Sequence, residues 1–258
     1  MLSYQHGFHA GNAADVHKHA MLAVALDYLT QKPKPLSYIE THSGRALYDL
    51  GSAKALKTGE AARGIGRMEA MLPADHPYCR AIAAARAKAG PQAYPGSPLI
   101  AQTLLRPDDH ITLAELHPQE VTALRKALPG ADVRQADGPA LALSLAPPTP
   151  RRGLCLIDPS YEIKSEWRDM APLVRKLHRA WNVGVILLWY PLLANDAHKA
   201  LLQGLDALKI EGAMQHEVRF PPARPGHGMI GSGLYVVNPP WGFEAAAQAL
   251  AAIFDQRT

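Results

Sequence analysis

The stretch GLCLIDPSY at residues 153–161 decides how this chain is expected to fold. Residues 153–157 are small or apolar throughout, which predicts a short strand buried on both faces of a parallel sheet. An acid, a proline, a serine and a tyrosine follow directly at residues 158–161. Open parallel sheets bind ligands outside the carboxyl ends of their strands. The stretch therefore predicts an α/β fold with a functional site beside Asp158.

The four residues 158–161 have the chemistry that methylation of an exocyclic base amine requires. The lone pair of adenine N6 is delocalised into the ring, so this amine is a poor nucleophile. The Asp158 carboxylate and the Pro159 carbonyl can accept its two N–H bonds, while Tyr161 can stack on the base. The usual pattern has a second proline where this chain has Ser160, which fixes the loop less firmly. A plain β-turn after a core strand also fits these residues.

A second tetrapeptide, Asn238-Pro239-Pro240-Trp241, fits the same pattern and also follows a predicted strand. Topology favours Asp158 as the functional acid, because it closes the fourth strand of an alternating strand–helix series. The later tetrapeptide closes the last strand, after a predicted hairpin of residues 215–220 and 232–238. In a methyltransferase sheet that last strand is antiparallel. We therefore expect residues 238–241 at the opposite edge of the sheet.

Composition sets broad limits. A chain of 258 residues with 48% hydrophobic and 19% charged residues is an ordinary globular domain, or one domain with an insertion. There is no apolar run of the ~18 residues that a membrane span needs, and residues 1–19 do not resemble a signal peptide. With only two cysteines, a reducing, cytoplasmic location is expected. The net charge is +4, and residues 51–93 hold seven basic and three acidic side chains. This excess favours a nucleic-acid partner only weakly, since a solvated helical face explains it equally well.

Strands and helices alternate along most of the chain. Expected strands are residues 35–40, 111–116, 132–136, 153–157 and 183–190, and expected helices are 15–29, 97–105, 118–128, 139–145, 167–179 and 195–208. Residues 49–93 are alanine-rich with glycine and proline breaks, which predicts an insertion of short helices without a strand. This alternation predicts an α/β sandwich with a mostly parallel sheet.

The other predicted strand ends also carry polar groups suited to a methyl donor. Residues 40–44 form a strand-to-helix turn in which small residues allow close backbone approach. Glu115 can accept hydrogen bonds from ribose hydroxyls, and Asp137-Gly138 can receive an adenine amine. Each acid alone could equally be a loop former or a helix N-cap. Together with Asp158, three acids recur at matching strand ends.

Histidines 6, 9, 17, 19 and 42 raise the question of a metal site. Their spacing lacks an accompanying acid or cysteine cluster, so no metal is predicted. Surface or capping roles are expected for His9 and His17.

Several blocks of the chain resemble the RlmJ family of bacterial 23S rRNA adenine-N6 methyltransferases. They are Met1-Leu2-Ser3-Tyr4, Phe8-His9-Ala10-Gly11-Asn12, Asp15-Val16, Lys18-His19, Thr41-His42, Tyr94-Pro95-Gly96-Ser97-Pro98, Glu115-Leu116-His117-Pro118, Ala136-Asp137-Gly138, Trp189-Tyr190-Pro191 and Asn238-Pro239-Pro240-Trp241. The similarity covers nearly the whole length. Departures are Glu40 in place of Asp, a loop at residues 43–46 with fewer glycines, and Ser160.

The resemblance implies a Rossmann-like α/β methyltransferase fold with a mostly parallel seven-stranded sheet, an antiparallel last strand and an inserted helical subdomain. It also implies that S-adenosylmethionine is the methyl donor and 23S rRNA the substrate. The donor-binding residues would be His19, His42, Ser97, Glu115, Asp137, Gly138 and Asp158. Asp158 would also bind the target amine and take its proton. Tyr4, His6 and Lys18 would contact the RNA, as would Pro159 and Tyr161 of the motif. The implied domains are a core of residues 1–48 and 98–258, with a mobile tail at 1–19, and a helical insertion at 49–97.

Two other functions remain open at this point. A DNA adenine methyltransferase would use the same motif, although an insertion of about 45 residues is small for a sequence-reading domain. A catalytically silent nucleic-acid-binding module could retain the fold, but the intact Asp158 and Tyr161 argue against it. We expect a monomer without a protein or membrane partner, acting on free or incompletely assembled rRNA.

Overall fold

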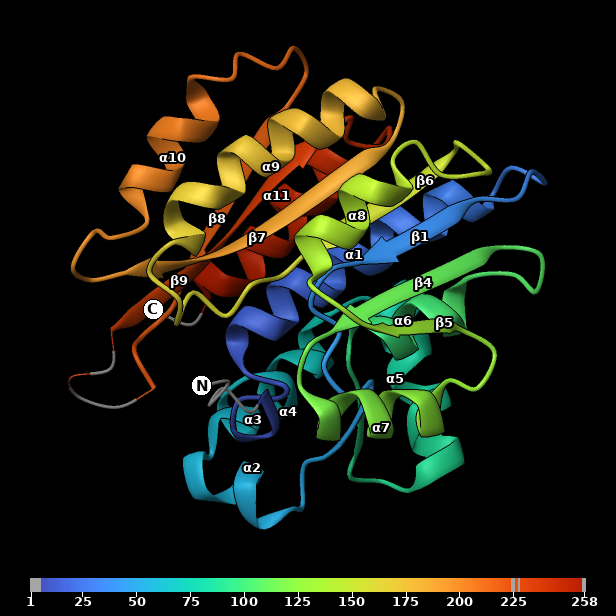
Figure 1. The fold of residues 1–258 in the computed structure, drawn as a ribbon. Helices are drawn as coiled ribbons and strands as arrows, with labels where there is room; N and C mark the ends of the chain where they lie inside the picture. The colour runs from blue at the N-terminus through green and yellow to red at the C-terminus, as the bar shows by residue number, and fades with distance from the viewer. Residues whose placement is uncertain (1–5, 224–225, 227, 257–258) are drawn as a thin grey trace.

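The computed structural model describes residues 6–223, 226 and 228–256. Its centre is a seven-stranded sheet in the order β5-β4-β1-β6-β7-β9-β8 (Figure 1). The strands are β1 (Ser37–Glu40), β4 (His110–Glu115), β5 (Asp132–Gln135), β6 (Gly153–Ile157), β7 (Val185–Leu193), β8 (Met214–Arg219) and β9 (Met229–Val237). The strand predicted at residues 153–157 is β6, with the same bounds.

Strand direction confirms the predicted topology. β1, β4, β5, β6 and β7 pair in parallel, whereas β9 lies antiparallel between β7 and β8. The last strand in sequence therefore runs opposite to the strands that precede it. The carboxyl end of β6 and the carboxyl end of β9 lie at opposite edges of the sheet.

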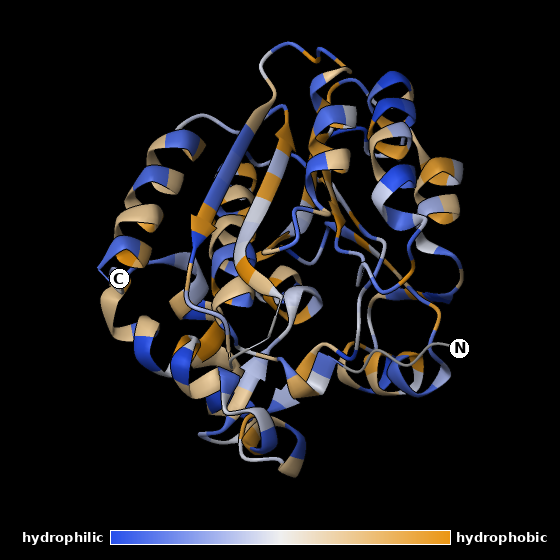
Figure 2. Cartoon of the chain, turned by 90° about the vertical axis from the view of Figure 1, so that its left-hand side faces the viewer, coloured by the Kyte–Doolittle hydropathy of each residue, from blue (hydrophilic) through white to orange (hydrophobic). Residues whose placement is uncertain are grey.

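Helices cover both faces of the sheet (Figure 1). α8 (Gly138–Leu145), α9 (Glu166–Ala180) and α10 (Lys199–Asp206) enclose one apolar cluster, and α1 (Ala13–Thr30), α6 (Ser97–Leu104), α7 (Pro118–Ala127) and α11 (Phe243–Asp255) enclose the other. Hydrophobic residues concentrate on the strands and on the inward sides of the helices, as burial of apolar surface requires (Figure 2). Within the described residues, no helix combines the length and apolar character of a membrane span.

A group of short helices interrupts the chain between β1 and α6. They are α2 (Ala53–Thr58), α3 (Glu60–Arg63), α4 (Ile65–Met68), the 3-10 helix η2 (Glu69–Met71) and α5 (Pro77–Ala89). The expectation that this region has no strand is wrong at its ends, where β2 (Leu47–Asp49) and β3 (Ala93–Pro95) pair antiparallel. Three-residue strands are too short to produce a recognisable alternation.

Helix α1 begins earlier than the sequence pattern predicts. Asn12 caps it, accepting a hydrogen bond from the backbone N–H of Asp15 at 2.9 Å. Residues 14–19 are buried even where they are polar, because α1 packs against β9, α11, α6 and the insertion. The tail boundary expected at residue 19 is therefore different in the structure, where residues 13–19 belong to α1. The 3-10 helix η1 (His6–Phe8) precedes this helix.

Candidate active site

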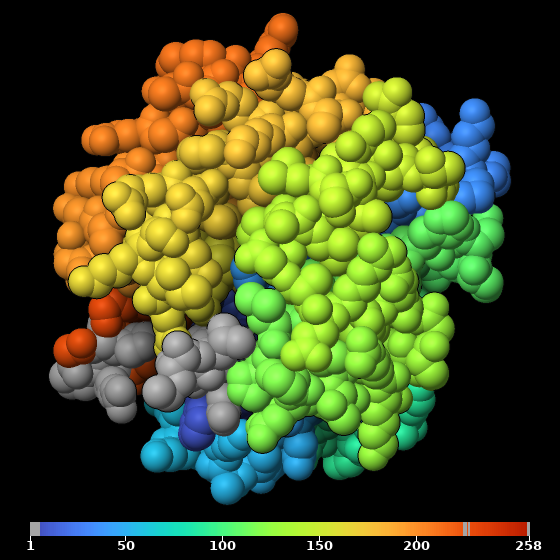
Figure 3. Space-filling view, in the orientation of Figure 1, coloured from blue at the N-terminus to red at the C-terminus, as the bar shows by residue number. Residues whose placement is uncertain are grey.

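A cavity of about 790 Å³ opens where the parallel strands β1, β4, β5 and β6 end. Its walls come from the loops that follow these strands, from the first turns of α1 and from the end of β7. Figure 3 shows the opening as a hollow between the yellow segment after β6 and the green segments after β4 and β5. This volume lies in the range of small-molecule sites.

The fold brings together most of the residues that the sequence predicted. Ten of them line this cavity, namely His6, Lys18, His19, His42, Ser97, Glu115, Asp137, Gly138, Asp158 and Pro159. Tyr161 is not among the lining residues, and Tyr4 lies outside the described residues. Residues separated by up to 153 positions in sequence, such as His6 and Pro159, therefore share one cavity.

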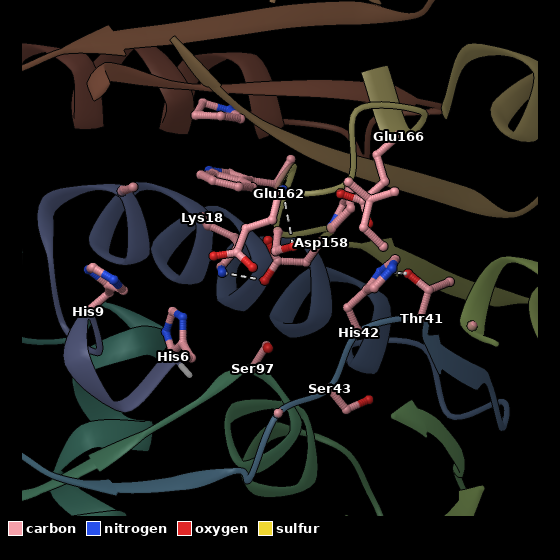
Figure 4. A pocket seen from close by; sticks show the side chains of 18 of the residues that line it. His6, His9, Lys18, Thr41, His42, Ser43, Ser97, Asp158, Glu162 and Glu166 are labelled. Carbon is pink, nitrogen blue, oxygen red and sulfur yellow. Dashed lines mark hydrogen bonds and ion pairs between the residues drawn. The ribbon is translucent and has the colours of Figure 1, made fainter. Parts of the chain in front are cut away.

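Asp158 forms an ion pair with a lysine from α1. The Lys18 ammonium donates to Asp158 Oδ2 and also lies 3.2 Å from Asp15 Oδ1. Figure 4 shows the two side chains pointing toward each other from α1 and from the end of β6. Burial alone would lower the pKa of Lys18, but the carboxylates of Asp158 and Asp15 raise it above its usual value. The ammonium therefore stays charged and holds the Asp158 carboxylate at the cavity wall.

Asp15 organises the amino-terminal segment around this ion pair, and sequence reasoning assigned it no role in the site. Its Oδ2 accepts hydrogen bonds from His6 Nε2 at 2.8 Å and from the backbone N–H of Gly11 at 2.9 Å. Burial would raise the pKa of the Asp15 carboxyl, yet His6, Lys18 and His19 together lower it well below its ordinary value. Asp15 thus links the position of His6 to that of Lys18.

The acids after β4 and β5 hold the neighbouring loops in place. Glu115 accepts hydrogen bonds from the backbone N–H groups of Gly44 and His117, at 2.9 and 2.8 Å. Asp137 caps α8 by accepting from Ala140 N at 2.8 Å. Next to it, a Cβ on Gly138 would lie 1.8 Å from the carbonyl oxygen of Thr41, so only glycine fits. The capping role considered for Asp137 is therefore present, and both acids still face the cavity.

The last residue of β1 is a buried acid, and the loop that follows supplies a buried hydroxyl. Among the described residues, Ser43 Oγ is buried without a hydrogen-bond partner, and Ser43 lines the cavity. Glu40 accepts hydrogen bonds from Ser97 Oγ at 2.5 Å and from Tyr38 OH at 2.8 Å. Burial raises the pKa of the Glu40 carboxyl to about 8, although these two hydrogen bonds oppose the shift. Glu40 therefore holds a proton at neutral pH, and the Ser97 hydroxyl that donates to it lies in the cavity wall.

Two histidines predicted to hold the donor are neutral at physiological pH. Burial lowers the pKa of His19 to about 3, and its Nδ1 lies 2.9 Å from Tyr94 OH. Burial also lowers the pKa of His42 to about 4, and its Nδ1 lies 2.7 Å from Thr41 Oγ1. These imidazoles therefore contribute hydrogen-bonding atoms without adding positive charge to the cavity wall.

Tyr161 packs inside the protein, away from the cavity wall. It is 8% exposed, its ring centroid lies 4.1 Å from that of Trp167, and its hydroxyl donates to the carbonyl oxygen of Trp189 at 2.8 Å. Its φ of 57° turns the chain directly after the motif. In this arrangement Tyr161 is bonded to the middle of β7, and its predicted stacking on a base stays a prediction.

Trp189 lines the cavity beside Lys18, unlike Tyr161. Its Nε1 donates to Ser232 Oγ at 2.9 Å, and the Lys18 ammonium lies 5.4 Å from its ring centroid. Sequence reasoning gave Trp189 no role, because it sits inside an apolar strand. The only signal was its place near the carboxyl end of that strand.

His17 is completely buried, so the expected surface or capping role is wrong for this residue. Its Nδ1 lies 2.8 Å from Ser232 Oγ and its Nε2 lies 2.9 Å from His216 Nδ1. The helix α1 packs against the sheet here, so a polar residue in its sequence becomes part of a buried network. His9 is partly buried and lies 3.0 Å from Glu60 in the insertion.

The competing tetrapeptide lies at the opposite edge of the sheet. Asn238 Nδ2 donates to the carbonyl oxygens of Asn182 and Gly184, at 3.0 and 2.8 Å, and both precede β7. Trp241 is 86% exposed. The expectation that residues 238–241 end away from the site at Asp158 is confirmed.

The sheet order and the acids that follow β4, β5 and β6 define a Rossmann-like methyltransferase. Comparison with known proteins supports this class. The model of the family described as Ribosomal RNA large subunit methyltransferase D, RlmJ, matches residues 33–257. Two curated proteins called Ribosomal RNA large subunit methyltransferase J are similar to the chain. The one from Escherichia coli K12 is 39% identical, and the one from Haemophilus influenzae is 38% identical. Each alignment covers 95% of this chain and 89% of the relative.

A crystal structure of a protein from Legionella pneumophila has a TM-score of 0.85 and 33% identity to this chain. The match covers 96% of this chain and 94% of the other. The chain therefore belongs to the RlmJ family of ribosomal RNA large subunit methyltransferases.

Proposed function

We propose that this protein transfers the methyl group of S-adenosylmethionine to the N6 amine of an adenine in 23S rRNA. The observation that carries the proposal is the position of Asp158 and Pro159 in the wall of a cavity whose adjoining wall presents Glu115 and Asp137. One side of the cavity then suits an amine substrate, and the other suits a nucleoside. Membership in a family of ribosomal RNA methyltransferases supports the choice of RNA as substrate.

The residues on the cofactor side fit S-adenosylmethionine. The buried Ser43 hydroxyl has no partner among the described residues, so it is available to the polar amino acid portion. Glu115 can accept hydrogen bonds from ribose hydroxyls and Asp137 from the adenine amine. His19, His42, Ser97 and Gly138 complete the donor site. When bound, the cofactor supplies an electrophilic methyl group.

Asp158 and Pro159 act on the target amine. The Asp158 carboxylate accepts one N–H bond of N6 and the Pro159 carbonyl accepts the other, which increases electron density on nitrogen. The Asp158 carboxylate then takes the proton that the amine loses. Lys18 keeps this carboxylate in position through their ion pair.

The remaining substrate contacts come from Tyr4, His6, Lys18 and Tyr161. His6 and Lys18 are both bonded to Asp15, so the RNA-facing side of the cavity is preorganised as one unit. A target adenine must leave its base stack to reach this cavity. This need favours free or incompletely assembled 23S rRNA as the substrate, and we propose that the protein acts on it as a cytoplasmic monomer.

Transfer of labelled methyl groups tests this function directly. Purified protein and labelled S-adenosylmethionine are incubated with total RNA from cells that lack the protein, and the labelled nucleotide is mapped. We expect N6-methyladenine in 23S rRNA and no label in adenine-containing duplex DNA. Label in tRNA or in duplex DNA instead would contradict the assigned substrate. Full transfer by Asp158→Ala would contradict the assigned mechanism.

A further inference from the structure

Trp241 is the most exposed of the large hydrophobic side chains in the described part of the protein, at 86%. It belongs to the tetrapeptide 238–241, which has no part in the cavity at the other edge of the sheet. Val183, in the neighbouring loop before β7, is 56% exposed. An exposed tryptophan beside an exposed aliphatic residue is typical of an interaction surface.

The loop that carries Trp241 is rigid. Asn238 has a φ of 53°, and its side-chain amide is bonded to the carbonyl oxygens of Asn182 and Gly184. Pro239 and Pro240 fix the next two φ angles. Gly242, with a φ of 80°, then starts α11. A rigid loop presents an aromatic ring with little loss of conformational entropy on binding.

Basic side chains lie in the loops along the same edge of the sheet as this tetrapeptide. Arg151 donates to Asn182 Oδ1 at 3.3 Å, which connects it to the loop of Trp241 through Asn182. The next residue, Arg152, donates to Lys34 O at 2.9 Å, and Arg106 donates to the same oxygen at 2.7 Å. Burial lowers the pKa of Arg152, and the nearby Arg106 guanidinium lowers it further. The two guanidinium groups add positive charge to this edge, although Asp108 and Asp109 offset the charge of Arg106.

The charge excess extends along the whole edge. The loops before β1, β4, β6 and β7 (residues 31–36, 105–109, 146–152 and 181–184) contain five basic residues and two acidic ones. The acidic pair, Asp108 and Asp109, lies beside Arg106. Lys32, Lys34 and Arg151 are exposed. Figure 1 shows that these loops gather at the side of the sheet away from the carboxyl ends of the parallel strands.

We propose that this edge is a second RNA-binding surface, on which Trp241 stacks with an unpaired base and Arg151, Arg152 and Lys34 contact phosphates. Base–aromatic stacking next to a basic groove is the general mode of single-strand recognition. The partner's identity as rRNA rests on the proposed function, since that substrate extends far beyond one adenine. The surface would bind a segment of the RNA distant from the methylated base. It would therefore increase the affinity for RNA without changing the rate of methyl transfer.

RNA binding without the methyl donor tests this surface separately from catalysis. The dissociation constant is measured at several salt concentrations for a long 23S rRNA fragment and for a short hairpin containing the methylated adenine. The variants are Trp241→Ala, Trp241→Phe and Arg151→Glu. Lys199→Glu is the matched charge reversal on α10, where Lys199 is 61% exposed and paired with Asp196.

We expect Trp241→Ala to weaken binding of the long fragment at least about fivefold, as loss of one stacked base predicts. Trp241→Phe should retain most of the affinity. Arg151→Glu should weaken binding and reduce the salt dependence by more than Lys199→Glu. The short hairpin should bind all variants like the wild type, with an unchanged kcat.

Two results would overturn the proposal. The first is wild-type affinity of Trp241→Ala for the long fragment, and the second is an equal loss of affinity for both RNAs. Failure of methyl transfer by the wild type would contradict the proposed function instead. The RNA-binding measurements would still test this surface, because they do not depend on methyl transfer.

Discussion

Two tetrapeptides of the same pattern, Asp158-Pro159-Ser160-Tyr161 and Asn238-Pro239-Pro240-Trp241, have opposite environments. The acid of the first lines a cavity and pairs with Lys18, and its aromatic residue is buried. The amide of the second bonds two backbone carbonyls, and its aromatic residue is exposed to solvent. Both follow strands of one sheet, β6 and β9.

The difference comes from strand direction. β6 runs parallel to its neighbours, so its end meets the ends of β1, β4 and β5, whereas β9 runs the other way. Local sequence decides which groups a turn offers, and topology decides which other groups meet them. The same sequence pattern can therefore place a catalytic acid at one edge of the sheet and expose an aromatic side chain at the other.

Removal of the acid should have the largest effect. We expect Asp158→Ala to reduce methyl transfer to rRNA by about 10³-fold or more. The substitution removes both the hydrogen-bond acceptor for the target amine and the base that takes its proton. Asn238→Ala should keep the wild-type kcat on a short hairpin. Single-turnover transfer rates measure both, with circular dichroism as a control for folding. Comparable losses in the two variants would mean that the tetrapeptides do not differ in function.

Glu40→Gln tests whether the buried Glu40 carboxyl is protonated at neutral pH. The pKa of Glu40 is raised to about 8 in the folded protein, above its ordinary 4.5. Its contribution to stability is therefore complete below about pH 4.5 and is lost as the pH rises through about 8, by up to about 4–5 kcal/mol. Glutamine cannot ionise, so the variant should gain stability relative to the wild type between pH 5 and pH 8.5. Urea unfolding at both pH values measures this gain, and an unchanged difference would contradict the assigned protonation.

Asn238→Asp should destabilise the opposite edge without affecting chemistry. A carboxylate in place of the amide loses two donated hydrogen bonds and faces two carbonyl oxygens, while the backbone φ of 53° remains accessible to aspartate. We expect the free energy of unfolding to fall by about 1–3 kcal/mol. The kcat on a short hairpin should be unchanged. A gain of methyl-transfer activity from this new acid would contradict the conclusion that only the edge with Asp158 supports catalysis.

Tyr161→Phe should have the smallest effect. It removes the hydrogen bond from the hydroxyl to Trp189 O, worth about 1 kcal/mol, and retains the ring. Trp189→Ala should raise the KM for rRNA more than Tyr161→Phe does, because Trp189 lines the cavity. Thermal unfolding and steady-state kinetics measure the two effects. A larger KM effect from Tyr161→Phe would show that the Tyr161 hydroxyl contacts the substrate directly.

Much of the fold could be read from residue patterns because buried parallel strands are uniformly apolar and regularly alternate with helices. Residues 153–157 and the acids 115, 137 and 158 show this most clearly, since each acid follows a strand of the predicted series. The buried polar residues of α1 could not be predicted in this way. Asp15, His17 and Lys18 are buried by contacts with distant segments, such as Ser232 and Asp158, that no local pattern contains.

The sequence by itself determined the order of strands and helices, the acids at the strand ends and the membership in a methyltransferase family. These follow from apolar periodicity and from motifs that are local in the chain. Only the tertiary structure decided that Tyr161 turns inward, that Trp189 takes its place in the cavity wall, and that Trp241 stands in solvent. The physical reason is that burial depends on what packs against a side chain, and strand direction sets those neighbours across hundreds of residues.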